Sequence, residues 1–181
     1  MKIIILCVFK IPYNLFMDYN EETIRSKYQL VPRTLVFIQH DDKYLFIHKK
    51  KKGSFGFQKL NGIGGHIEMG EEPFESARRE IMEESGLKIK DLSLAALVFI
   101  EIGINPGILM FVFHATYTEG KLCGSDEGDL LWLNRSDLEN EDNIVKDVPF
   151  LLEITEQHQP GSPPRIIKYL YDGEKQLRIV Y

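Results

Sequence analysis

Apolar and polar residues follow a strand-like pattern in two neighbouring segments of the chain. Residues 34–39 and 44–48 are rich in β-branched, aromatic and other apolar side chains, in short runs that are typical of strands. The polar sequence His-Asp-Asp-Lys at residues 40–43 separates them. A short polar connection between two strand-like runs predicts a β-hairpin.

The rest of the chain contains further strand-like runs, with no internal repeat and no low-complexity linker. These runs lie at residues 94–102, 109–117, 130–133, 166–171 and 176–181. The last two flank the turn sequence Asp-Gly-Glu-Lys at 172–175 and predict a terminal hairpin, whereas residues 148–157 are compatible with a helix. The length of 181 residues suits one well-buried core. We therefore expect a single α+β domain over residues 30–181.

Residues 1–29 precede this domain as an extension. Lys2 is followed by seven apolar residues that imitate the start of a secretory signal peptide. Lys10 ends this run, and no small-residue cleavage site follows, because residues 11–19 are bulky and mixed. We expect an edge strand or a packing segment here, and an extension that packs on the core.

Composition and charge exclude several classes of protein. The hydrophobic share of 44% and the charged share of 27% are ordinary for a soluble globular protein and argue against disordered, collagen-like and membrane classes. A formal net charge of −5 argues against a large nucleic-acid surface, because phosphate backbones are bound by clustered Lys and Arg. The two cysteines, Cys7 and Cys123, have neither the number nor the spacing of a disulfide framework or a zinc site. We expect a cytoplasmic protein.

Residues 73–85 predict the helix that carries the chemistry. Pro73 suits the first helical position, and Gly86 suits the position just past the end. At helical spacing, apolar residues share one sector, and the adjoining sector carries Glu80, Glu83 and Glu84. These three carboxylates repel one another, and they lie toward the helix end where the dipole disfavours anions. We therefore expect a bound cation to stabilise them.

The chemistry of these side chains indicates which cation. Oxygen ligands without His or Cys partners suit Mg²⁺ or Mn²⁺, and Mg²⁺ in proteins usually binds a few carboxylates together with phosphate oxygens of a substrate. A polyphosphate is therefore the expected ligand of this helix. Taken alone, such a cluster of glutamates is more often a solvated acidic helix face.

The segment from Gly65 to residue 87 resembles the signature of a known family. Five residues separate Gly65 from Glu71, and seven more lead to Arg-Glu-Ile-Met-Glu-Glu-Ser-Gly-Leu at 79–87. This spacing is similar to the Nudix box at every specified position, an agreement that chance does not explain. The resemblance implies an α/β/α sandwich around a central mixed β-sheet, hydrolysis of a nucleoside diphosphate linked to another moiety, and a requirement for Mg²⁺ or Mn²⁺.

The resemblance also implies roles for residues of the box. Glu80, Glu83 and Glu84 resemble the catalytic, metal-binding carboxylates, and Glu80 or Glu84 is the candidate that orients or deprotonates the attacking water. Glu71 and Arg79 look like the family's structural ion pair, which ties the loop to the helix.

Two segments before the helix have candidate roles. Gly64 and Gly65 would let backbone carbonyls approach the metal, although a plain tight turn explains the same two glycines. Residues 49–52 are four consecutive lysines, and Lys59 follows them. These lysines lie close enough in sequence to meet substrate phosphates, although such a run is more often solvated.

Among branches of the family, the chain is most similar to hydrolases of oxidised purine nucleoside triphosphates such as 8-oxo-dGTP, which release a monophosphate and pyrophosphate. Asn61, at the start of Asn-Gly-Ile-Gly-Gly, resembles a base-contacting Asn, and Glu127 resembles an additional metal-binding Glu. Asp147 is a candidate for reading the base edge, or alternatively for capping the helix that follows. Leu60 stands where this branch has a stacking Trp, and Trp132 is expected in the core.

Other functions remain open. Hydrolysis of ADP-ribose, a nucleotide sugar or a dinucleoside polyphosphate is the main alternative, although Pro106 lies too far beyond the box to match the proline of the ADP-ribose branch. A non-catalytic nucleotide-binding module is a second alternative, but such modules typically lose a box carboxylate. In each case the expected partner is a small nucleotide, with no membrane and no large nucleic acid, and the protein is a monomer or a homodimer.

Overall fold

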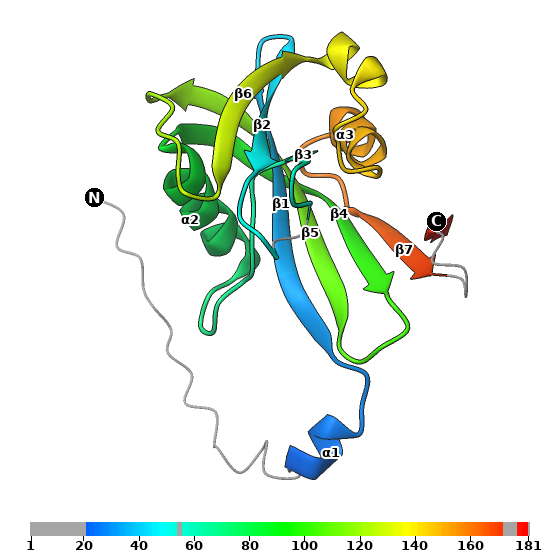
Figure 1. Cartoon of the computed structure of the whole chain (residues 1–181). Coiled ribbons are helices and arrows are strands. Elements are labelled where there is room, and N and C mark those ends of the chain that lie inside the picture. Colours follow the sequence, from blue (N-terminus) through cyan, green and yellow to red (C-terminus); the bar gives the residue numbers. More distant parts are fainter. Residues whose placement is uncertain (1–20, 54–55, 172–176, 181) are drawn as a thin grey trace.

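The strand-like runs of the sequence form one mixed β-sheet in the computed structural model (Figure 1). The structure describes residues 21–53, 56–171 and 177–180. The expected strand or packing segment within residues 3–9 and the turn at 172–175 lie outside the described residues. Within the described ranges, no helix is both long enough and apolar enough to cross a bilayer.

The sheet combines parallel and antiparallel strand pairs. Its strands are β1 (Leu30–His40), β2 (Lys43–Lys49), β3 (Leu60–Asn61), β4 (Lys88–Glu101), β5 (Gly107–Glu119), β6 (Gly128–Asn134), β7 (Arg165–Tyr171) and β8 (Leu177–Val180). Their order is β3-β2-β1-β5-β4-β7-β8, and β6 also pairs with β2. The pairs β1–β5 and β4–β7 are parallel, and the others are antiparallel. The predicted hairpin of β1 and β2 is confirmed, and β7 and β8 pair where the sequence predicts a terminal hairpin.

Helices cover both faces of this sheet. Helix α2 (Pro73–Ser85) lies on one face, and α3 (Val148–Gln157) lies on the other (Figure 1). Strand β1 shows the reason, because Leu35 and Phe37 pack in the cluster that contains α3, whereas Val36 and Ile38 pack in the cluster that contains α2. A sheet that is apolar on both faces needs a layer on each side. The expected α/β/α sandwich with a mixed sheet is confirmed.

Local signals at both ends define α2, whose bounds agree with the prediction. Pro73 occupies the first turn, and Glu72 caps it by accepting hydrogen bonds from the backbone N–H groups of Phe74 at 3.0 Å and Glu75 at 2.9 Å. Gly86 ends the helix in the left-handed conformation, with φ of 69°. Pro73 and Gly86 predicted the ends of this helix, whereas Glu72 was not identified as its cap from the sequence.

Strand β4 is longer than the prediction. It begins at Lys88 rather than at residue 94, and it pairs with β5 as far as Glu119 through several register shifts. Lys88 Nζ lies 2.6 Å from Glu119 Oε1 at the far end of this ladder. Residues 88–91 are mostly polar, so the apolar pattern alone does not reveal that pairing with β5 extends the strand.

The described part of the N-terminal extension contacts the connection between β4 and β5. Helix α1 (Glu21–Arg25) leads into a segment whose Gln29 backbone N–H donates to Asn105 Oδ1 at 2.8 Å. Asn105 Nδ2 in turn donates to the Lys27 carbonyl at 3.0 Å. These two bonds fix residues 27–29 against the loop before β5. A short 3-10 helix, Arg135–Asn140, follows β6.

Candidate active site

One large cavity brings together residues from distant parts of the chain. Its volume is about 890 Å³. The lining residues come from β1, the lysine run, the glycine loop, α2, β4, β5 and the two segments around Glu127 and Asp147. They include Arg33, Leu35, Lys49, Lys51, Asn61, Gly64, Gly65, His66, Glu80, Glu83, Glu84, Ile100, Ile108, Met110, Glu127 and Asp147. Lys59 is not among them, so the structure does not bring it to this cavity with the other candidate residues.

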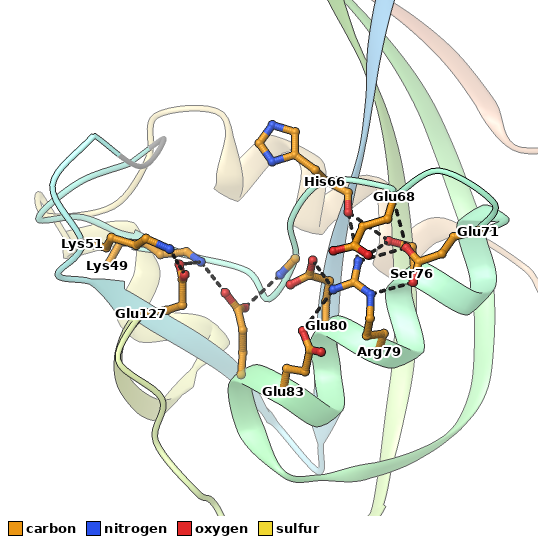
Figure 2. A network of polar contacts seen from close by, with 12 residues as sticks. Lys49, Lys51, His66, Glu68, Glu71, Ser76, Arg79, Glu80, Glu83 and Glu127 are labelled. Atoms are coloured by element: carbon orange, nitrogen blue, oxygen red, sulfur yellow. Dashed lines mark hydrogen bonds and ion pairs between the residues drawn. The ribbon is translucent and has the colours of Figure 1, made fainter.

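Arg79 organises two of the three α2 carboxylates. Its Nη1 lies 2.9 Å from Glu80 Oε1 and 3.0 Å from Glu83 Oε2 (Figure 2). The Glu80 side chain is largely buried at 12% exposure, whereas that of Glu83 is 61% exposed. Burial raises the pKa of the Glu80 carboxyl, and the hydrogen bond and charge of Arg79 oppose this shift. Glu80 is thus the more restricted of the two carboxylates, and Glu83 has room to move.

Arg79 also joins the loop before α2 to the helix. Its Nε donates to Glu71 Oε1 at 2.6 Å, and its Nη2 donates to Glu71 Oε2 at 3.0 Å and to the His66 carbonyl at 3.0 Å. These charge-assisted bonds lower the pKa of Glu71 to about 2. Because the pair is bidentate, it fixes the direction of the loop that carries Gly64 and Gly65 relative to α2 (Figure 2).

Lys49 makes a buried ion pair with the third α2 carboxylate. Lys49 Nζ lies 2.5 Å from Glu84 Oε1, and the two side chains are only 7% and 4% exposed. Burial raises the pKa of Glu84, an effect that Lys49 and the hydrogen bond from the Gly64 backbone N–H at 3.1 Å oppose. Lys49 Nζ also lies 3.7 Å from Glu127 Oε2. Burial therefore distinguishes Lys49 from a simply solvated lysine.

The rest of the lysine run divides between the cavity and the outer surface. Lys51 Nζ contacts Glu127 Oε1 at 2.6 Å, which lowers the pKa of that carboxyl (Figure 2). Lys50 instead pairs with Asp129 at 2.5 Å, with both side chains more than half exposed. Lys52 lines the cavity. Lys50 is therefore a solvated lysine, whereas Lys49 and Lys51 bring positive charge to Glu84 and Glu127.

The glycine loop passes very close to β1 and α2. A Cβ atom on Gly64 would overlap the Thr34 carbonyl oxygen, and Gly64 has φ of 150°. A Cβ on Gly65 would clash with Glu80 Oε1 and lie 2.7 Å from its Cδ. The Gly65 carbonyl already accepts the Thr34 backbone N–H at 2.9 Å and retains a second lone pair. Close approach, rather than a tight turn alone, explains both glycines.

The donor chemistry of this region fits a hard divalent cation. Glu80, Glu84 and Glu127 offer carboxylate oxygens, and the missing Cβ of Gly65 leaves the space that the Glu80 carboxylate occupies. In the conformation described, these oxygens face Arg79, Lys49 and Lys51, and no three acidic, His or Cys side chains of the described residues converge on one point. In this conformation, Arg79, Lys49 and Lys51 therefore compensate the charge of the acidic cluster.

The other part of the cavity contains apolar and polar groups that suit a nucleoside base. Asn61 is 8% exposed, and its Oδ1 accepts the Gly62 backbone N–H at 2.9 Å, which presents Nδ2 as a donor. Asp147 stands at the cap position of α3, but its side chain makes no capping bond. Burial raises the pKa of Asp147, and its own backbone N–H and the Tyr169 side chain oppose this shift. The structure therefore places Asp147 at the cavity and not in the alternative capping role.

Several lining residues were not identified from the sequence. They are Arg33 and His66 at the polar part of the cavity and Leu35, Ile100, Ile108 and Met110 on the sheet. The apolar four belong to ordinary strand runs, and only pairing between strands shows that they share one face. Arg33 carried a usable signal, because it is a charged residue close to the apolar run of β1. Trp132 lies outside the cavity lining and packs against the α2-side cluster, as predicted.

The chain belongs to the NUDIX domain family, which matches residues 29–154. The oxidized purine nucleoside triphosphate hydrolase of Danio rerio is 36% identical over 102 residues, which cover 56% of this chain and 64% of that protein. The NAD-capped RNA hydrolase NudC of Klebsiella pneumoniae is 31% identical over 123 residues, covering 63% of this chain and 44% of that protein. The alignments thus span less than two thirds of each curated relative.

A solved structure supports the same architecture. The crystal structure of the mutator MutT protein from Bacillus halodurans superposes with a TM-score of 0.64 at 23% identity and covers 83% of this chain and 97% of that one. This likeness concerns the fold. Together with the family match, it confirms the resemblance that the box predicted.

Proposed function

We propose that this chain is a divalent-metal-dependent pyrophosphohydrolase that cleaves a nucleoside triphosphate to a monophosphate and pyrophosphate. One observation carries the proposal, namely that a single cavity joins the α2 carboxylates to Asn61, Asp147 and an apolar floor. This floor consists of Leu35, Ile100, Ile108 and Met110. The cavity volume of about 890 Å³ is suited to a nucleotide-sized ligand. The likeness to the Danio rerio hydrolase supports oxidised purine nucleoside triphosphates such as 8-oxo-dGTP as the substrate class.

Mg²⁺ or Mn²⁺ is the proposed cofactor. Glu80, Glu83, Glu84 and Glu127, with the Gly65 carbonyl, are the residues that would hold it. When bound, the ion supplies charge that neutralises phosphate oxygens and lowers the pKa of the attacking water. Glu83 is exposed enough to turn toward such an ion, and the Glu71–Arg79 pair keeps the glycine loop and α2 in register while it does so.

Glu80 and Glu84 are the candidates that accept the proton of the attacking water. Burial raises the pKa of both carboxyls, which makes each a better base than an exposed glutamate. Lys49 keeps Glu84 ionised in the buried site by pairing with it at 2.5 Å. Lys51 and Lys52 lie at the same side of the cavity and supply positive charge for the phosphates of the substrate.

Asn61 and Asp147 are the proposed base-recognition residues. The bond from Gly62 fixes the Asn61 amide so that its Nδ2 donates to an acceptor on the base. Asp147, whose pKa is raised by burial, can accept a hydrogen bond when ionised and donate one when protonated. Leu60 is 4% exposed and buried in the α3-side core, so base stacking does not come from that position.

The test is release of pyrophosphate and monophosphate with Mg²⁺ and with chelator, across 8-oxo-dGTP, the ordinary dNTPs, ADP-ribose and diadenosine polyphosphates. We expect metal-dependent turnover with preference for an oxidised purine triphosphate. The double variant Glu80→Gln/Glu84→Gln should lose turnover, whereas Glu153→Gln, an exposed carboxylate on α3, should retain it. Unchanged turnover in the double variant would contradict the metal-site assignment.

The same panel separates the alternatives. Preference for ADP-ribose, a nucleotide sugar or a dinucleotide would retain the carboxylate site and reject the proposed base specificity. The likeness to an NAD-capped RNA hydrolase supports including NAD in the panel. Tight nucleotide binding without any turnover would favour a non-catalytic binding module.

A further inference from the structure

Arg33 lies at the junction between the two parts of the cavity. It is on β1, two residues before Leu35, so both side chains project from the same face of the strand, and both line the cavity. In the parallel ladder with β5, Arg33 is directly opposite Met110, which also lines the cavity. On its other side, Arg33 forms an antiparallel bridge with His66 of the glycine loop.

Arg33 lines the same cavity as Glu80 and His66. The charge of Glu80 acts on Arg33, and the charge of Arg33 acts on His66. The guanidinium therefore lies within electrostatic range of both the carboxylate that touches Gly65 and the loop that follows it. Leu35 and Met110, the neighbours of Arg33 in the sheet, belong to the apolar floor.

Positive groups thus flank the α2 carboxylates on two sides. Lys49 pairs with Glu84 and Lys51 pairs with Glu127, whereas Arg33 interacts with the charge of Glu80. Because Leu35 and Met110 are neighbours of Arg33 in the sheet, a nucleotide whose base lies on the apolar floor brings its first phosphate next to Arg33. An arginine fork suits a phosphate group because it offers two parallel N–H donors to two oxygens.

We propose that Arg33 forms a subsite for the phosphate that stays attached to the nucleoside, on the floor side of the bond that is cleaved. This proposal rests on the proposed pyrophosphohydrolase function, and it assigns the two products to different cations of the cavity. Arg33 holds the nucleoside monophosphate, and the lysine side holds the pyrophosphate. The residue is a determinant of substrate position, because it fixes which phosphoryl group faces the α2 carboxylates.

The test is the affinity of each product for the full-length protein, measured by calorimetry in Mg²⁺ with dGMP, 8-oxo-dGMP and inorganic pyrophosphate as separate probes. Arg33→Met should weaken binding of the monophosphates roughly tenfold or more, which is the size expected for a hydrogen-bonded charged contact. Pyrophosphate binding should change little. Arg33→Lys should bind the monophosphates more weakly than the unmodified protein but more tightly than Arg33→Met, since lysine keeps the charge and loses the fork.

Arg78→Met is the matched control, because Arg78 is an exposed arginine of α2 and is absent from the cavity lining. This variant should bind all three probes as the unmodified protein does. Equal weakening of monophosphate and pyrophosphate by Arg33→Met would overturn the proposal, since it would show a general effect of charge. Deoxyguanosine serves as a fourth probe, and equal weakening of deoxyguanosine and dGMP would also overturn the proposal, because Arg33 would then act on the base or sugar.

The outcomes distinguish this proposal from the proposed function. If the unmodified protein hydrolyses no nucleoside triphosphate, the proposed function fails whatever the binding data show. If it hydrolyses one and Arg33→Met leaves monophosphate affinity unchanged, only the subsite is wrong. Arg33→Lys preserves length and charge, so it tests the same contact should Arg33→Met fail to fold.

Discussion

Removing the buried Lys49 ammonium should destabilise the protein far more than removing its neighbour's. Lys49 and Lys50 each make an ion pair at 2.5 Å, with Glu84 and Asp129 respectively. Their surroundings differ, since the first pair is 7% and 4% exposed and the second is 56% and 66% exposed. Lys49→Met leaves an uncompensated buried carboxylate, which typically costs about 3 to 5 kcal/mol. Lys50→Met removes an exposed pair that is worth roughly 0 to 1 kcal/mol.

Urea unfolding in chelator, followed by the fluorescence of Trp132, measures both free energies of unfolding. Lys49→Met/Glu84→Gln should recover part of the loss, because the uncompensated charge is gone and the glutamine oxygen can still accept the Gly64 N–H. If Lys49→Met costs no more than Lys50→Met, the assignment of Lys49 to a buried, stabilising ion pair is wrong.

The pH dependence of the same variant provides a second measurement. Burial already raises the pKa of Glu84, and loss of Lys49 raises it further. A carboxyl whose pKa is raised by folding binds its proton more tightly in the folded state, so acidification stabilises the fold. The difference between the unmodified protein and Lys49→Met should therefore be largest at alkaline pH, where Glu84 is ionised, and shrink on acidification. A difference that grows on acidification would contradict this account.

Three further predictions concern the glycine loop and its ion pair. Gly65→Ala should lower kcat/KM on the order of a hundredfold while the fold survives, because the new methyl group displaces the end of the Glu80 side chain and meets no backbone atom. Gly64→Ala should instead lower the melting temperature, because its methyl group meets backbone and its φ of 150° strains any side chain. Glu71→Gln should destabilise the protein at neutral pH, and urea unfolding should show this difference shrinking as pH falls from 4.5 toward about 2, because a lowered pKa gives stability that is lost on protonation.

One matched variant checks the two glycine substitutions, and the pH profile checks the Glu71→Gln result. Gly124→Ala introduces the same methyl group where nothing lies within 4 Å, so neither turnover nor melting temperature should change. Full turnover in Gly65→Ala would show that Glu80 does not need its present position. A Glu71→Gln effect that stayed constant down to about pH 2 would show that the Arg79 pair is not its source.

The sequence by itself determined the helix of the box and much of the sheet. Pro73 and Gly86 act locally, since one fits the first turn and the other adopts φ of 69° at the end, so the bounds of α2 follow from neighbouring residues alone. The hairpin of β1 and β2 likewise follows from two short apolar runs on either side of a polar turn. The family, too, was identified from residues 65–87, because the positions within one loop and one helix are related by fixed spacing.

Tertiary structure decided how the cavity is completed, because its remaining residues meet only through pairing of distant strands. Arg33 pairs with His66 of the glycine loop on one side and with Met110 of β5 on the other. The sequence around Arg33 does not predict these partners. The lysine run has no internal signal that separates Lys49 from Lys50. Lys49 ends β2 and pairs with the buried Glu84, whereas Lys50 lies just beyond the strand and pairs with Asp129 at the surface. Asp147 stands where a helix cap was an equal possibility, and its burial beside Tyr169 favoured the cavity. The sequence spacing of the box thus identified its carboxylates, whereas tertiary packing decided which residues these carboxylates face.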